Sequence, residues 1–346
     1  MAMPESRTLR LGRWSRQFDL YSWRNALGAV LACGLAGGCA LLLGAVPLSP
    51  LALLQAFVQP DGHAGVIVVQ LRGLRVLLAL LCGASLAVSG WLFQQVMRNA
   101  LASPDTLGVT AGASAAAIAY LSYLAADWGM AGLPIAAITG ALTVIAVVYR
   151  LAWHAGTTPL RLILMGIGMA ALCGAATTFI LVSSPLTTTL SAYVWLTGSV
   201  YGANWVEVRQ LALCCAGLAL ALVPLLRHAL LAPLDDALAA GLGVRVQRMR
   251  VLLTLLASLL AGVAIAWGGA MAFVGLIAPH MARRITPAPG AAQLITSAAL
   301  GATLVMLSDL LGRTLFAPLD LPAGIFVAAI GTPFFLTLLL RQARQL

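Results

Sequence analysis

The side chains that could carry chemistry in this chain are few, and arginine dominates the charged ones. All 20 basic residues are arginine, and the 346-residue sequence contains no lysine. A P-loop needs its lysine against the β- and γ-phosphates of a bound nucleotide, so the chain has no ATPase site of that kind. If ATP drives its work, another subunit hydrolyses the nucleotide.

The residues that commonly bind metals form no recognisable site. The four histidines are scattered, with no HxxxH pair and no cluster of histidine with cysteine. The six cysteines lie in apolar runs without a CxxC pair, which is typical of small buried hydrophobic residues. Met165 and Met169 are one helical turn apart, and core packing explains them better than a haem or copper site. The sequence therefore predicts no bound metal and no cofactor.

The composition places these residues in a membrane protein. The chain is 61% hydrophobic and 9% charged, whereas a soluble domain has about 25% charged residues. Its net charge of +10 does not indicate a nucleic-acid partner, because the arginines are spread along the chain at the ends of apolar runs. We therefore expect an all-α polytopic protein in the lipid bilayer.

Ten apolar runs are predicted to be transmembrane helices. They cover residues 26–46, 74–97, 107–125, 130–150, 161–182, 205–226, 248–268, 272–284, 291–312 and 322–340. The run Leu48–Gln59 is too short to cross and contains Pro50, so it predicts a helix on the surface, and Thr187–Gly202 is similar. Residues 1–25 form an Arg-rich segment with apolar residues at helical spacing, either an interfacial helix or a solvated tail.

The distribution of arginines sets the orientation of the helices. With the N-terminus in the cytoplasm, 16 of the 20 arginines fall in inside loops, as the positive-inside rule expects. Both termini are then cytoplasmic, and residues 1–25 are a cytoplasmic segment that precedes a transmembrane domain over residues 26–346. The arginines placed outside are Arg72, Arg75, Arg209 and Arg313.

The interiors of the ten runs are almost free of charge. No run carries a carboxylate near its middle, where ion-coupled carriers usually hold ionisable residues. This absence argues against ion coupling, and an ion-coupled secondary transporter is kept as the alternative from another class of protein.

Small residues recur at helix-packing spacing and predict close contacts between helices. They are Gly83, Ala87 and Gly90, then Gly108, Gly112 and Ala116, and finally Gly166, Ala170 and Gly174.

Six segments carry a resemblance that covers nearly everything after the first run. They are Arg72-Gly-Leu-Arg75 with the apolar run after it, Arg98 to Gly112, Trp195-Leu-Thr-Gly-Ser199, Gly241-Leu-Gly-Val244, Phe273-Val-Gly-Leu-Ile-Ala-Pro-His280, and Leu321-Pro-Ala-Gly324 followed by Ile330-Gly-Thr-Pro-Phe334. In this order they resemble the FecCD-like permease subunits of the ABC importers for iron chelates, haem and vitamin B12.

The resemblance implies ten helices in the bacterial inner membrane, with a second permease subunit as partner. That partner is either a second copy or a sister permease. Two cytoplasmic ATPase subunits and a periplasmic or lipid-anchored substrate-binding protein complete the importer. Arg72, Arg75 and Arg313 match the outer arginines that meet glutamates of the binding protein. Guanidinium suits this role because it stays charged and can hold a carboxylate through two hydrogen bonds.

Three further sets of residues follow from the resemblance. In the inner loop of about 227–250, Pro233 is expected to begin a short helix with Gly241 at its C-terminal cap. The ATPase-coupling residues are Asp235, Asp236, Leu238, Gly241, Gly243 and Val244. The residues expected at the cytoplasmic gate are Asn99, Leu101, Thr157 and Thr158, where ordinary connecting turns are the alternative. The residues expected on the substrate pathway are Trp195, Ser199 and Tyr201, where an interfacial aromatic belt is the alternative.

The substrate expected from this resemblance is an iron chelate. The absence of a metal-ligand pattern fits a metal that is already wrapped in a chelator, such as a ferric siderophore or ferric citrate. Haem and cobalamin are the alternatives within the family. The expected mechanism is alternating access driven by ATP hydrolysis on the separate subunits.

Overall fold

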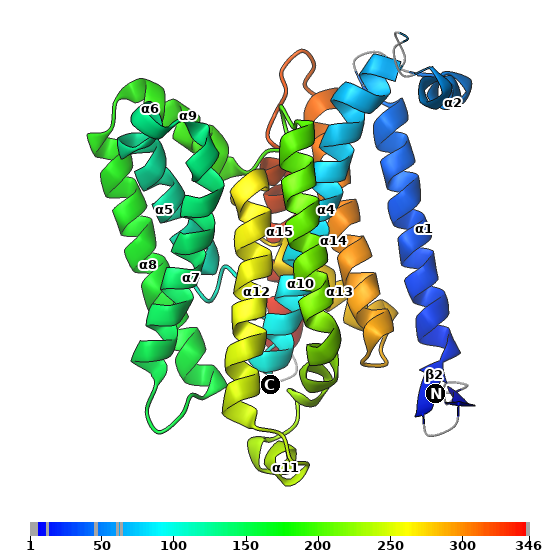
Figure 1. The fold of residues 1–346 in the computed structure, drawn as a ribbon, viewed down its shortest axis with the longest axis vertical. Helices are drawn as coiled ribbons and strands as arrows, with labels where there is room; N and C mark the ends of the chain where they lie inside the picture. The colour runs from blue at the N-terminus through cyan, green and yellow to red at the C-terminus, as the bar shows by residue number, and fades with distance from the viewer. Residues whose placement is uncertain (1–5, 12–13, 45–47, 60–61, 63–64, 344–346) are drawn as a thin grey trace.

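The computed structural model of the chain is a bundle of helices with a small strand pair at its N-terminal end (Figure 1). It describes residues 6–11, 14–44, 48–59, 62 and 65–343. Each of the ten apolar runs corresponds to one helix. The helices are α1 (Leu20–Leu42), α4 (Gly73–Val96), α5 (Val109–Tyr123), α7 (Leu133–Ala152), α8 (Pro159–Ser183), α10 (Trp205–Leu231), α12 (Val246–Gly268), α13 (Val274–Ile285), α14 (Ala291–Thr314) and α15 (Ala323–Ala343).

Most of these helices are long enough to cross a membrane. Seven described helical segments meet that requirement in length and composition, and α5 and the part of α15 up to Thr337 are shorter apolar helices. A π-helical segment, η1 (Val66–Arg72), lengthens α4 at its start. The expected all-α polytopic fold is confirmed. Helix α13 differs in length, because its 12 residues cover about 18 Å of a hydrocarbon core of about 30 Å.

Short helices connect the long ones. The two expected between spans are confirmed as α2 (Pro50–Val58), whose first turn is capped by Ser49, and α9 (Leu186–Thr197). The others are α6 (Ala125–Trp128), η2 (Met130–Gly132) and α11 (Asp236–Gly241). Helix α11 projects beyond the ends of the long helices, at the end of the bundle where the N-terminal strands also lie (Figure 1).

The N-terminal segment is not the helix that the spacing of its apolar residues suggested. Strands β1 (Ser6–Leu11) and β2 (Trp14–Asp19) pair in antiparallel register, with Ser6 opposite Asp19. The chain turns helical at Leu20, where the Asp19 side chain accepts hydrogen bonds from the backbone N–H of Tyr21 and Ser22. Apolar residues spaced three to four positions apart therefore do not guarantee a helix, because a pair of strands can satisfy the same backbone groups.

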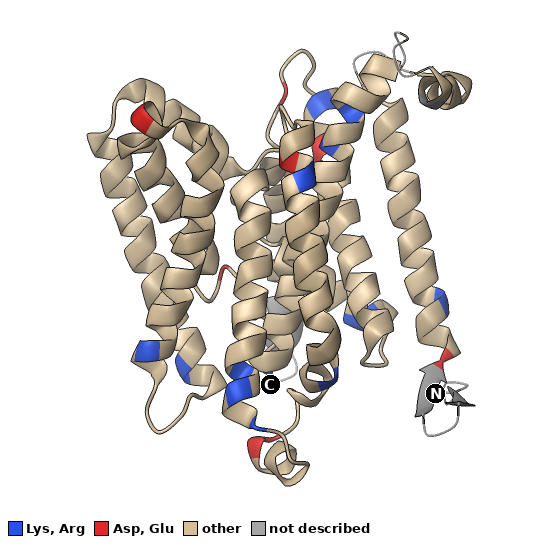
Figure 2. Ribbon diagram, viewed as in Figure 1, with Lys and Arg blue, Asp and Glu red and all other residues tan. Residues whose placement is uncertain are grey.

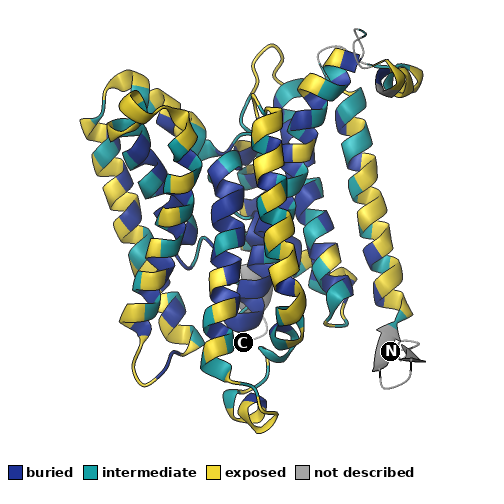
Figure 3. Ribbon diagram, in the orientation of Figure 1, coloured by how far each residue is buried: buried dark blue, intermediate teal, exposed yellow. Residues whose placement is uncertain are grey.

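The core of the bundle surrounds α4 and α12. In the most apolar stretch of each of these two helices 72% of residues are buried, against 17% in α1, α8 and α10 (Figure 3). Most charged residues lie toward the two ends of the bundle and leave long uncharged stretches in the helices, although one acidic position lies in a connection between the ends (Figure 2). Helices with exposed apolar faces and uncharged middles are what a lipid environment or a neighbouring subunit requires.

Glycines allow the central helices to approach closely. A Cβ on Gly83 of α4 would lie 2.3 Å from the carbonyl oxygen of Gly301 in α14, and one on Gly90 would lie 1.7 Å from that of Gly275 in α13. Gly112 packs in the same way on α7. The predicted close contacts are confirmed for α4 and α5. On α8 only Gly166 has such a neighbour, and nothing lies within 4 Å of Gly174.

The connection between α4 and α5 enters the bundle. Asp105 was expected in a cytoplasmic turn, but its Oδ2 accepts a hydrogen bond of 3.3 Å from the backbone N–H of Phe273, just before α13 begins. The other end of α13 lies at Ile285, whose carbonyl oxygen is bound by Asn25 near the start of α1. Asp105 is thus about 18 Å from that end of α13. Asp105 lies between two of the predicted runs, so the expectation that no run carries a carboxylate near its middle still holds, but its cytoplasmic turn was not expected to reach the start of α13.

Candidate functional site

The predicted docking arginines lie together at the end of the bundle opposite α11. Arg72 is buried, and its Nη1 donates hydrogen bonds of 2.9 and 3.1 Å to the carbonyl oxygens of Leu41 and Leu42 at the end of α1. Arg313 on α14 donates to the carbonyl oxygen of Ala40. These two side chains therefore tie α1 to α4 and α14.

Arg75 is the centre of this group. One of its nitrogens lies 2.5 Å from Oδ1 of Asp309 in α14, and the other lies 2.6 Å from Oδ2 of Asp320 in the connection between α14 and α15. Asp309 is buried and also lies 3.5 Å from Arg313, four residues further on. The sequence placed the arginines on one face but missed their two acidic partners. Only the Asp309–Arg313 spacing gave a signal for such a pair.

The predicted pathway residues lie beside this charged group. The ring of Tyr201 is exposed, and the Arg75 guanidinium stacks over it with its carbon 5.4 Å from the ring centre. Ser199 accepts a hydrogen bond from the backbone N–H of Tyr201, and its own N–H donates to the carbonyl oxygen of Gly268 at the end of α12. Trp195 is half-buried on α9 and packs against the core. Their place on a substrate pathway stays a prediction.

Backbone contacts hold the segment after α9 against the start of α15. Gly198 has φ +79° and accepts a hydrogen bond from the N–H of Gly324 at the start of α15. A Cβ on Gly324 would lie 1.7 Å from the carbonyl oxygen of Thr197. The Trp195–Ser199 and Leu321–Gly324 motifs of the sequence therefore meet at one point, where only glycine fits.

At the opposite end, α11 forms an elbow with the start of α12. Asp235 is the N-cap of α11, and its Oδ1 accepts a hydrogen bond of 2.9 Å from the N–H of Ala237. The helix begins at Asp236 rather than at Pro233. Gly241 is its last residue rather than its cap, and Gly243 takes the left-handed conformation with φ +81°. The two-part elbow is present, and its turn depends on Gly243.

The elbow presents apolar side chains to the outside. Leu238 and Leu242 are 57% and 60% exposed, while Ala239 beneath them is buried. The N–H of Val244 donates to the carbonyl oxygen of Ala239, which closes the turn into α12. Leu238 on the projecting helix and Leu242 just after it therefore leave apolar side chains exposed beyond the ends of the long helices.

Asp236 sits at the base of the elbow between two arginines. Its carboxylate accepts hydrogen bonds from Arg98, which follows α4, and from Arg250 of α12. Burial raises the pKa of Asp236, but the hydrogen bonds from Arg250 and Arg98 outweigh it and hold that pKa below the ordinary 3.8. The pair is therefore charged at neutral pH and is lost only as the pH falls through that lowered value.

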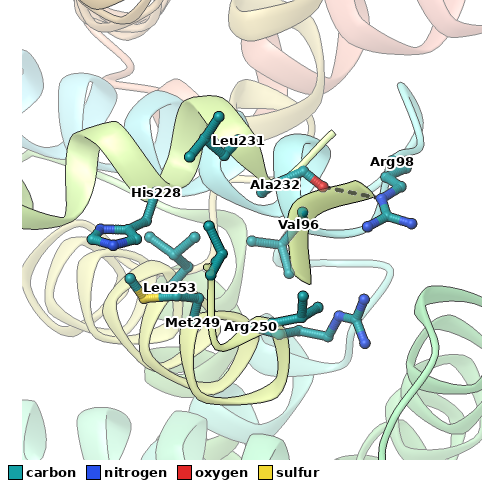
Figure 4. Close-up of a pocket in the computed structure, with 11 residues that line it drawn as sticks. Val96, Arg98, His228, Leu231, Ala232, Met249, Arg250 and Leu253 are labelled. Carbon is teal, nitrogen blue, oxygen red and sulfur yellow. Dashed lines mark hydrogen bonds between the residues drawn. The ribbon is translucent and has the colours of Figure 1, made fainter. Parts of the chain in front are cut away.

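Arg98 and Arg250 border a small cavity between the ends of α4, α10 and α12 (Figure 4). Val96, Leu231 and Leu253 give it apolar walls, and His228 and Arg250 line it from opposite sides. Arg98 reaches across to the carbonyl oxygen of Ala232, 3.0 Å from its Nε. The cavity is thus part of the joint between the elbow and the bundle.

The predicted gate residues occupy two turns at this same end. Asn99 accepts a hydrogen bond of 2.9 Å from the N–H of Leu101 and shapes the turn after α4. Thr157 is buried before α8, whereas Thr158 is exposed. Both turns contact the elbow through arginine, but their action as a gate stays a prediction. Among the residues that the structure describes, no three His, Cys, Asp or Glu side chains could hold a metal ion.

Comparison with known proteins gives a consistent result. The sequence matches the FecCD transport family over residues 31–341. It is 57% identical over 336 residues to the achromobactin transport system permease protein CbrC of Dickeya dadantii, with 96% of each chain covered. It is 41% identical over 270 residues to the Probable siderophore transport system permease protein YfhA of Bacillus subtilis, covering 77% of this chain and 79% of that one.

A solved structure shares the same architecture. It is described as an inward-facing conformation of a metal-chelate type ABC transporter. The two superpose with a TM-score of 0.79 at 27% identity, covering 92% of this chain and 99% of the other. On the family match, the identities and this fold, the chain belongs to the FecCD transport family.

Proposed function

We propose that this chain is the permease subunit of an ATP-driven importer that moves a ferric siderophore, or a similar iron chelate, from the periplasm to the cytoplasm. The single observation that supports this most is the 57% identity, along almost the whole chain, to a permease named for achromobactin transport. Haem and cobalamin are the alternative cargoes. The chain resides in the bacterial inner membrane, with residues 26–346 as the permease domain and residues 1–25 in the cytoplasm.

The partners of this permease occupy its two ends. Two ATPase subunits bind on the α11 side, where Leu238 and Leu242 are exposed. A substrate-binding protein docks at the opposite end through Arg72, Arg75 and Arg313, and it meets Arg75 on the side held by Asp320, the more exposed of its two acidic partners. A second permease subunit, a copy or a sister, covers apolar faces of the bundle. The passage runs past Trp195, Ser199 and Tyr201 toward the turns of Asn99 and Thr157.

An ion-coupled carrier remains less well supported. Asp105 is a carboxylate at mid-depth, but its two oxygens are engaged by the Thr110 hydroxyl at 2.7 Å and by the N–H of Phe273. A carboxylate held in this way supports the start of α13, where the helix dipole favours an anion. It therefore serves the fold rather than ion binding.

The proposed function is tested by reconstituting the permease with its ATPase and binding protein in liposomes. We expect ATP hydrolysis and uptake to rise with one class of ferric siderophore and not with haem or cobalamin. Stimulation by cobalamin or haem alone would replace the proposed cargo. Uptake that follows a pH or sodium gradient without nucleotide would overturn the importer as a whole.

The exposed leucines of α11 give a separate prediction. Replacing both Leu238 and Leu242 by alanine should weaken binding of the ATPase by about tenfold or more, since exposed apolar side chains that fill a partner's groove act as hot spots. The control is Leu151→Ala, an exposed leucine at the end of α7. Titration of labelled ATPase onto permease nanodiscs measures the difference. Equal affinities for the two variants would remove α11 from the interface.

A further inference from the structure

Arg250 joins the coupling elbow to the turn that precedes α8. Its Nη2 lies 2.9 and 3.0 Å from the two carboxylate oxygens of Asp236 in α11. Its Nη1 donates to the carbonyl oxygen of Thr157. The Arg250 side chain is only 4% exposed and Thr157 is buried, whereas the Asp236 side chain is 42% exposed. One guanidinium therefore spans two segments that are separated by about eighty residues of sequence.

Gln247 reinforces the grip on Thr157 from one turn earlier in α12. Its Oε1 accepts hydrogen bonds of 3.1 and 3.0 Å from the backbone N–H and the hydroxyl of Thr157. Its Nε2 donates to the Thr157 carbonyl oxygen at 3.2 Å. All of the polar atoms of Thr157 are thus held by α12. We therefore expect the turn at Thr157 to move whenever the start of α12 moves.

The same carboxylate also reaches the other predicted gate turn. Arg98 contacts Oδ1 of Asp236. Its Nε also donates to the carbonyl oxygen of Ala232 (Figure 4). Arg98 directly precedes Asn99, whose side chain shapes the turn into the bundle. Asp236 is therefore a branch point. It is at the base of the helix that faces the ATPase, and it bonds to Arg98 beside the first turn and to Arg250, which in turn bonds to Thr157.

The burial of Arg250 makes this connection stiff. Although Asp236 is 42% exposed, loss of its carboxylate would leave the buried Arg250 guanidinium with only the Thr157 carbonyl oxygen among the partners described above, which is unfavourable. Arg250 therefore follows Asp236 when α11 moves. Arg248, two residues earlier, is exposed and provides a comparison on the same helix.

We infer that Asp236 and Arg250 transmit movement of α11 to the gate turns, with Arg250 as the positioning residue for Thr157. This inference rests on the proposed function, because it assumes that an ATPase moves α11. It extends that function by naming how the two sites communicate. Neither residue touches the cargo in this account.

The test separates the charge of Arg250 from its forked shape. Arg250→Lys keeps the charge, but a single ammonium cannot make the bonds to Asp236 and Thr157 together. In reconstituted importers we expect the amount of chelate transported per ATP hydrolysed to fall about fivefold or more, and Arg248→Lys to leave that ratio at the wild-type value. Adding Asp236→Ala to Arg250→Lys should lower the ratio no further than the more severe single variant.

A second measurement does not depend on the cargo. A cysteine at the exposed Thr158, in a background without the native cysteines, is labelled with a thiol reagent in the presence and absence of ATP and vanadate. We expect a nucleotide-dependent change in labelling rate that Arg250→Lys abolishes. A merely structural role would lower the yield of complex while leaving the transport ratio and the labelling change intact, and that result would overturn the inference. A wild-type complex that shows the labelling change but imports no iron chelate would contradict the proposed cargo alone.

Discussion

Replacing Arg75 by leucine should destabilise the outer end of the bundle more than any other single charge removal there. The substitution leaves the buried carboxylate of Asp309 without its 2.5 Å partner. Removing one member of a buried ion pair typically costs about 3–5 kcal/mol, because the remaining charge stays desolvated. Arg313, 3.5 Å from Asp309, offsets part of this cost. The expected result is a lower unfolding temperature and a lower yield of folded protein in detergent.

Two control variants show whether the loss of stability comes from the buried ion pair. Arg209→Leu removes an exposed arginine at the same end and should change the unfolding temperature little. The double variant Arg75→Leu with Asp309→Asn removes both charges of the buried pair and should recover much of the loss. If Arg75→Leu and Arg209→Leu behaved alike, the ion pair would contribute nothing to stability, and Arg75 would be available for docking alone.

The same geometry changes how docking should be tested. Reversing Arg75 to glutamate places a third carboxylate beside Asp309 and Asp320, so a loss of binding-protein capture would report misfolding as well as docking. Asp320 is the more informative position, because it is 29% exposed and holds the side of Arg75 that faces outward. Asp320→Asn keeps the Arg75–Asp309 pair. If a glutamate of the binding protein takes the place of Asp320, this variant should bind the protein more tightly.

The helices of this fold could be predicted because the membrane leaves the sequence little choice. Each apolar run must satisfy its backbone groups within itself, so hydropathy located all ten helices, including α13 at Val274–Ile285. The depth of a connection is a different problem. The polar residues between Arg98 and Asp105 suggested a cytoplasmic turn. Inside the bundle, however, the Asp105 carboxylate accepts a hydrogen bond from the backbone N–H at the start of α13. That bond joins residues 168 positions apart, and no local pattern carries it.

The candidate sites show the same division between residues and partners. The outer arginines were placed on one face by the charge rule, but the bonds of Arg75 to Asp309 and Asp320 span 234 and 245 positions. The elbow around α11 was expected from Asp235 and Gly243, whose local roles are readable from sequence. Its connection through Arg250 was missed, because an arginine at a cytoplasmic helix end satisfies the positive-inside rule without further explanation.

Gly90→Ala should be among the most damaging single methyl additions at the described glycines, together with Gly324→Ala. The Cβ added at Gly90 would lie 1.7 Å from the carbonyl oxygen of Gly275, and that obstacle is backbone rather than a side chain that can turn away. Helices α4 and α13 would have to separate, and the cost should reach or exceed the roughly 1–3 kcal/mol typical of overpacking. Because the start of α13 is bound to Asp105, the strain would reach the connection after α4 as well.

The expected loss of stability depends on how close the added Cβ comes to its neighbour, so three glycines at different distances test the prediction. Gly83→Ala meets the carbonyl oxygen of Gly301 at 2.3 Å and should be harmful but less so. Gly28→Ala on α1 has nothing within 4 Å of the new Cβ and should be neutral or slightly stabilising, since alanine favours helix over glycine by up to about 1 kcal/mol. Unfolding temperatures in detergent should therefore fall in the order Gly28→Ala, Gly83→Ala, Gly90→Ala. Equal values for the three variants would contradict the close backbone contact between α4 and its neighbours, on which the position of α13 depends.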